Sequence, residues 1–179
     1  MNRRKSSINK IKRDNSSSKN IEAGLVMDLY LKGHSPITTH FSGHMQECDV
    51  LSISKADYIY EYEVKISISD FKADFKKEKH KLITEKIFNE TVTLIKEGNR
   101  TFESPNPYYV PNYFYFVVPE NLISVEEIPD YAGLIYMKEN GKFETIKKAL
   151  ILHKTKASNE LIRSIAHQLM CKLVFKKIN

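Results

Sequence analysis

Two short runs of alternating residues, 49–53 and 59–66, constrain the fold of this 179-residue chain more than any other feature. In each run, β-branched or aromatic residues alternate with polar ones at a period of two, which predicts two β-strands joined by a tight connection. Successive side chains of a strand point to opposite faces. The second strand therefore has one apolar face and one charged face, which carries Glu61, Glu63 and Lys65.

The charged face suggests chemistry as well as structure. Pairing of the two strands is expected to bring Asp49 close to Glu63 and Lys65. Two converging carboxylates repel each other unless a cation lies between them, and hard oxygen ligands suit Mg²⁺ or Mn²⁺. A neighbouring lysine can orient or deprotonate a water molecule, or stabilise charge on a phosphate. The same three residues could instead form ion pairs on an exposed strand face, and local pattern alone favours neither interpretation.

The spacing resembles a known signature. Asp49, thirteen intervening residues and then Glu63-Val64-Lys65 are similar to the Asp…(Asp/Glu)-x-Lys pattern of the PD-(D/E)xK nuclease superfamily. The order of residues 63–74, 113–120 and 130–135 resembles the MmcB-like DNA-repair proteins, a bacterial group placed in that superfamily. The resemblance covers roughly residues 47–146. It has two departures: Cys48 stands where the superfamily name expects proline, and residues 80–111 look inserted.

This resemblance implies an α/β fold of the restriction-endonuclease-like kind, with a mixed central β-sheet flanked by α-helices. It also implies a Mg²⁺- or Mn²⁺-dependent nuclease that hydrolyses phosphodiester bonds of DNA, in DNA repair or in the DNA processing of phages and mobile elements. Asp49, Glu63 and the carbonyl of Val64 would bind the metal, and Lys65 would position the attacking water. The alternative is a DNA-binding accessory module that keeps the fold and cleaves nothing.

Two helices are expected to flank these strands. The first spans about residues 20–32 and places Glu22 on or beside its buried face, where the resemblance implies an accessory metal ligand or an orienting group. A first-turn glutamate favoured by the helix dipole is the local alternative. The second helix is expected to run from a capping box at Ser67 and Asp70 to about Lys81. Its lysines are candidates for contacts with the DNA backbone, namely Lys72, Lys76, Lys77 and Lys79. A solvated face with local ion pairs explains the same lysines equally well.

The later part of the chain completes the predicted domain. Residues 113–118 are apolar on both faces and predict a central strand, and residues 133–137 and 142–146 predict a hairpin. Residues 158–175 have helical spacing and would form core or the contact surface of a homodimer. The insert, with a turn at Gly98-Asn99, is expected to flank the active-site cleft.

Charge is concentrated at one end of the chain. The net charge is +6, yet residues 1–19 hold seven basic residues and one acidic residue, which leaves twenty-one of each for the remainder. This Ser-rich segment predicts a flexible basic arm, in which Arg3 and Arg4 would contact phosphates, or a terminus that only aids solubility. Residues 20–179 are expected to form one domain. No run of eighteen apolar residues occurs and the two cysteines lack metal-type spacing, so we expect a cytoplasmic protein that does not enter membranes.

Overall fold

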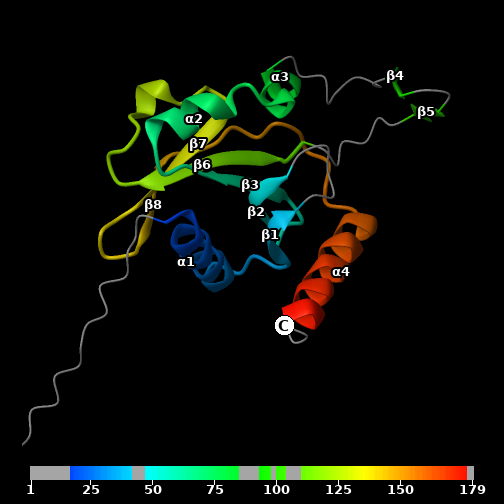
Figure 1. The fold of residues 1–179 in the computed structure, drawn as a ribbon, viewed down its shortest axis with the longest axis horizontal. Coiled ribbons are helices and arrows are strands. Elements are labelled where there is room, and N and C mark those ends of the chain that lie inside the picture. The colour runs from blue at the N-terminus through cyan, green and yellow to red at the C-terminus, as the bar shows by residue number, and fades with distance from the viewer. Residues whose placement is uncertain (1–16, 42–46, 85–92, 98–99, 104–109, 177–179) are drawn as a thin grey trace, which may run out of the picture.

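The computed structural model describes residues 17–41, 47–84, 93–97, 100–103 and 110–176. Its centre is a six-stranded mixed sheet with the order β1-β2-β3-β6-β7-β8 (Figure 1). The strands are β1 Ile37–Phe41, β2 Cys48–Ile53, β3 Ile59–Val64, β6 Tyr113–Pro119, β7 Ala132–Met137 and β8 Phe143–Lys147. The pairs β3–β6 and β6–β7 are parallel, and the other neighbours are antiparallel. The predicted α/β fold, of the restriction-endonuclease-like kind, is confirmed.

Four α-helices accompany the sheet in the described part of the chain. They are α1 Ser18–Leu31, α2 Ile68–Asp74, α3 Glu78–Thr84 and α4 Asn159–Lys176, with a short 3₁₀ turn at Val125–Glu127. The insert contributes an antiparallel pair, β4 Thr93–Glu97 and β5 Arg100–Glu103, while its predicted turn at Gly98-Asn99 lies outside the described residues. No described helix has the length and apolar character needed to span a membrane.

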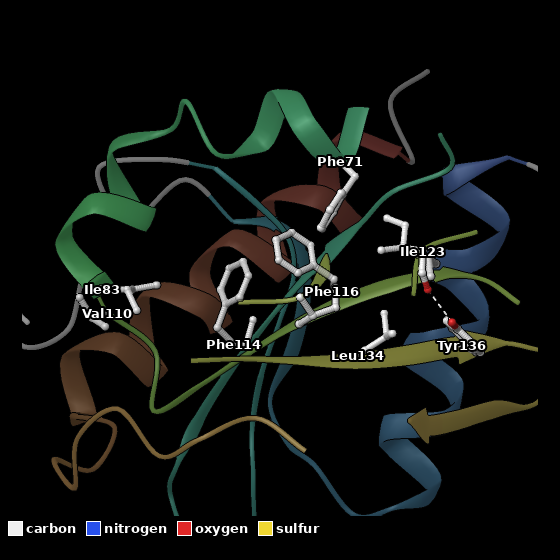
Figure 2. Close-up of a cluster of buried hydrophobic side chains, with 11 residues drawn as sticks. Phe71, Ile83, Val110, Phe114, Phe116, Ile123, Leu134 and Tyr136 are labelled. Carbon is white, nitrogen blue, oxygen red and sulfur yellow. Dashed lines mark hydrogen bonds between the residues drawn. The ribbon is translucent and has the colours of Figure 1, made fainter. Parts of the chain in front are cut away.

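Among the residues that the structure describes, the core forms three clusters, and each cluster attaches a helix to the sheet. On one face, Ile21 and Leu25 of α1 pack against Tyr62 and Val64 of β3. On the opposite face, Phe71 of α2 lies over the rings of β6 (Figure 2). The first half of α4 packs by Leu161 and Ile165 against β2 and the edge strand β1. The sheet is thus covered on both sides.

Strand β6 is central because both of its faces are apolar. Phe114 and Phe116 point toward α2 and α3, as Figure 2 shows, and both side chains are fully buried. Val117 belongs to the cluster beneath α1 on the other face. The predicted position of this strand and the predicted hairpin β7–β8 are therefore confirmed.

The prediction of one helix from Ser67 to about Lys81 was wrong. Ser67 does cap a helix, since its hydroxyl accepts from the Asp70 amide at 3.2 Å. However, α2 ends at Asp74, the backbone turns, and α3 begins at Glu78. The break changes which way the later side chains face, so that His80 is buried and Phe75, expected inside, is partly exposed.

Candidate active site

Asp49 is held against strand β3 by a backbone hydrogen bond. Its Oδ2 accepts from the amide of Val64 at 2.7 Å, next to the first β2–β3 pair, in which Val50 lies opposite Tyr62. The carboxylate of Asp49 is therefore directed at the strand that carries Glu63 and Lys65. Burial, followed by the negative charge of Glu63, raises the pKa of Asp49 from 3.8 to about 6, although the Val64 amide and Lys65 act in the opposite direction. Burial is thus the main cause of the raised pKa of Asp49, and the nearby charge of Glu63 adds to it.

Glu63 is fully buried and contacts three lysines. Its Oε2 accepts from Lys65 at 2.8 Å and from Lys77 at 3.0 Å, and its Oε1 contacts the ammonium of Lys79. Burial on its own would raise the pKa of Glu63, but the lysines, above all Lys79, hold that pKa below its ordinary value. Glu63 is consequently ionised and strongly anchored.

A second buried carboxylate, Asp74, shares two of these lysines. Its Oδ1 lies 2.7 Å from Lys65 and 2.6 Å from Lys77, and its Oδ2 lies 2.7 Å from Nε2 of His80. Burial opposes ionisation of Asp74, yet the hydrogen bonds from His80, Lys65 and Lys77 hold its pKa well below the usual range. The pKa of Lys65 is lowered by burial but raised more by Glu63 and Asp74, so Lys65 is protonated.

Lys79 links these groups to a third carboxylate. It contacts Glu61 at 2.8 Å as well as Glu63, and its ammonium lies 5.4 Å from the ring centre of Phe114. Burial raises the pKa of Glu61, and Lys79 partly reverses this effect. We refer to the six residues Glu61, Glu63, Asp74, Lys65, Lys77 and Lys79 as the ionic cluster. Its three carboxylates and three ammonium groups balance in formal charge.

Glu22 is close enough to Asp49 for its charge to act on that carboxylate. It is buried, and its Oε2 lies 3.0 Å from Nε2 of His40, whose Nδ1 lies 3.0 Å from Glu47. The negative charge of Glu22 also contributes to the raised pKa of Asp49. The buried position expected for Glu22 is present, and His40 is the partner that a buried carboxylate requires.

The predicted DNA-binding lysines divide into two groups. Lys72 and Lys76 are exposed on and just beyond α2. Lys77 and Lys79 instead turn toward the carboxylates because the helix is interrupted after Asp74. Arg3 and Arg4 lie outside the described residues. Contact between any of these residues and DNA stays a prediction.

Four participants were missed as site residues by sequence reasoning. Asp74, His80 and Tyr131 form a chain, in which Nδ1 of His80 lies 2.7 Å from the Tyr131 hydroxyl, and His40 pairs with Glu22. The local signal for Asp74 was its place among the lysines of residues 72–79, where it could supply ion pairs on a solvated helix face. Tyr131 follows a loop far along the chain and gave no signal.

The donor set can be tested for its fit to a divalent ion. Asp49, Glu63 and the Val64 carbonyl offer hard oxygen atoms, as Mg²⁺ and Mn²⁺ prefer, and a bound cation would offset the burial and the charge of Glu63 that raise the pKa of Asp49. Yet the described residues contain no group of three His, Cys, Asp or Glu side chains arranged to hold a metal. Both oxygens of Glu63 already contact lysines. The donor chemistry fits a divalent ion, therefore, provided that a lysine leaves Glu63.

Comparison with known proteins identifies a likeness of fold. No protein-family model matches the chain, and no curated protein matches it. A solved structure, a protein of unknown function from Silicibacter pomeroyi (SPO1766), is similar with a TM-score of 0.59 and 18% identity. The match covers 87% of this chain and 88% of that one. At this identity the likeness concerns the fold alone.

Proposed function

We propose that this protein is a metal-dependent nuclease that hydrolyses DNA phosphodiester bonds, with a site similar to that of PD-(D/E)xK enzymes. One observation carries the proposal: Asp49 is held 2.7 Å from the Val64 amide, beside Glu63 and Lys65 of the same strand segment. This is the juxtaposition that the Asp…Glu-x-Lys spacing requires. The pKa of Asp49, which burial and the charge of Glu63 raise, supports the proposal, because a cation between two carboxylates would reduce their repulsion.

Each residue has a role that follows from its environment. Asp49, Glu63 and the Val64 carbonyl would hold Mg²⁺ or Mn²⁺, which supplies Lewis acidity and offsets charge on the phosphate when bound. Lys65 is protonated, so it acts as a hydrogen-bond donor that orients water and stabilises developing negative charge, rather than as a base. Glu22, fixed by His40, would orient groups on the Asp49 side.

Affinity for DNA would come from lysines near the site and from the basic arm. Lys72 and Lys76 extend from the segment that also delivers Lys77 to Glu63, so a phosphodiester backbone held there would pass close to the ionic cluster. Such contacts are salt-sensitive and independent of base sequence. The nuclease would act in the cytoplasm, in DNA repair or in the processing of phage or mobile-element DNA.

A second candidate is a DNA-binding accessory module without catalytic activity. The observation in its favour is the balanced ionic cluster, because Glu63 has three ammonium partners and is stable without a metal. Such a protein would bind DNA in a salt-dependent manner and cleave nothing.

Cleavage of labelled single- and double-stranded DNA with Mg²⁺ or Mn²⁺ distinguishes the two candidates. Asp49→Asn and Lys65→Met should abolish cleavage, whereas salt-dependent DNA binding, measured by fluorescence anisotropy, should persist in Asp49→Asn. Asp57→Asn is a matched control, because Asp57 is exposed at the opposite end of the same β2–β3 hairpin. Binding without cleavage by the wild type under either metal would favour the accessory module.

A further inference from the structure

The three lysines of the ionic cluster differ in their access to solvent. The side chain of Lys65 is 5% exposed and that of Lys79 is 12% exposed, whereas that of Lys77 is 37% exposed. Lys77 also lies in the turn between α2 and α3, where its amide donates to the Asp74 carbonyl at 2.9 Å. It is therefore the cluster lysine with a route to solvent.

Departure of Lys77 would leave no carboxylate of the cluster without a partner. Glu63 would keep Lys65 at 2.8 Å and its contact with Lys79, and Asp74 would keep Lys65 at 2.7 Å and His80. Glu63 and Asp74 thus each have two other partners besides Lys77. Its removal is less costly than the removal of a sole partner from a buried charge.

Formal charge indicates what could replace Lys77. With Asp49 ionised, the four carboxylates Asp49, Glu61, Glu63 and Asp74 face Lys65, Lys77 and Lys79, which leaves one negative charge. Without Lys77 the balance is two negative charges, which matches one divalent cation. The Oε2 of Glu63, which accepts from both Lys65 at 2.8 Å and Lys77 at 3.0 Å, would then keep Lys65 and have one lone pair free for a metal ion.

We infer that Lys77 is an exchangeable internal counter-ion, which blocks Glu63 in the free protein and moves to a DNA phosphate when DNA binds, so that a divalent ion can enter. This inference rests on the proposed nuclease function and adds a form of regulation to it. The exposed Lys72 and Lys76 would bring the polyanion to the segment that carries Lys77. Metal and DNA should then bind cooperatively, and by linkage each should strengthen the other equally.

The test measures metal binding rather than cleavage. Isothermal titration of the full chain with Mn²⁺ should show about tenfold tighter binding to Lys77→Met than to wild type in the absence of DNA. A non-cleavable phosphorothioate duplex should strengthen Mn²⁺ binding to the wild type by a similar factor and leave Lys77→Met almost unchanged. Lys81→Met, which removes an exposed lysine of the neighbouring helix α3, should behave as the wild type does with and without DNA.

The outcomes separate this inference from the proposed function. Equal Mn²⁺ affinity of wild type and Lys77→Met, lost in Asp49→Asn, would overturn the exchange and leave the metal site standing. Absence of Mn²⁺ binding in every protein, with and without DNA, would overturn the metal-dependent function as well. If Lys77→Met does not fold, the effect of the duplex on wild-type Mn²⁺ affinity decides, because independence of DNA contradicts the exchange.

Discussion

Replacement of Asp49 by Asn should stabilise the metal-free protein at neutral pH. The folded state raises the pKa of Asp49 from 3.8 to about 6, so ionisation of this carboxyl opposes folding. The associated stability is fully present below pH 3.8 and is lost as the pH rises through 6. Between about pH 4.5 and about pH 7.5 the loss amounts to about 2 kcal/mol, an upper value because Asp49 is partly accessible to solvent.

Asparagine avoids this loss while it keeps an oxygen that can accept from the Val64 amide. Urea unfolding of both proteins at the two pH values gives the free energies of unfolding, and groups common to both proteins cancel in the difference. The advantage of Asp49→Asn should grow by up to about 2 kcal/mol from the lower to the higher pH. An advantage that is the same at both pH values would refute the assignment of destabilising charge to Asp49.

The same experiment with Mg²⁺ present connects stability to the proposed site. An ion that binds only the folded state raises the free energy of unfolding. Added Mg²⁺ at about pH 7.5 should therefore stabilise the wild type and leave Asp49→Asn unchanged. Equal stabilisation of both proteins would indicate binding at another place.

Two further substitutions test the scaffold by urea unfolding. Asn112→Ala should lower the free energy of unfolding by about 2–4 kcal/mol, because the buried Asn112 accepts from the Ile59 amide at 2.7 Å and donates to the carbonyls of His153 and Thr155. The control Asn140→Ala, in an exposed turn, should lower it by about 1 kcal/mol or less. Gly133→Ala should cost about 1–3 kcal/mol, since a Cβ there would lie 2.3 Å from the Tyr115 ring and 2.8 Å from the backbone nitrogen of Ala149. Unchanged unfolding midpoints in Asn112→Ala or Gly133→Ala would contradict these packing arguments.

The parts of the fold that local pattern determines were predictable. Strands β2, β3 and β6 follow from alternation and apolar runs. The pairing of β2 with β3 then brings Asp49 to Val64. The helix carrying Glu22 was also predicted, although it begins at Ser18 with Ser17 as its cap rather than at Asn20. In these cases the residues that decide the structure are neighbours in sequence.

The environment of Glu63 was predictable only in part, because distant residues determine it. Continuous helical spacing from Ser67 placed Lys77 and Lys79 on an outer face, whereas the buried Asp74 contacts Lys65, which follows β3, and His80 of α3. Helix propensity reflects each residue's local preference and not its buried partners, so it did not predict the interruption of the helix after Asp74. His40 as the partner of Glu22 was missed for the same reason, since seventeen residues lie between the two in the chain.

Phe116 connects the apolar core to the charged residues of the site. Its Cα is in register with that of Glu63 across the parallel pair β3–β6, and its ring centre lies 4.9 Å from that of Phe71 and 6.0 Å from that of His80. One aromatic side chain therefore packs beside the strand that bears Glu63 and against the two helices, α2 and α3, whose connecting turn holds Lys77. A change of this ring would therefore reach the ionic cluster without touching any charged residue.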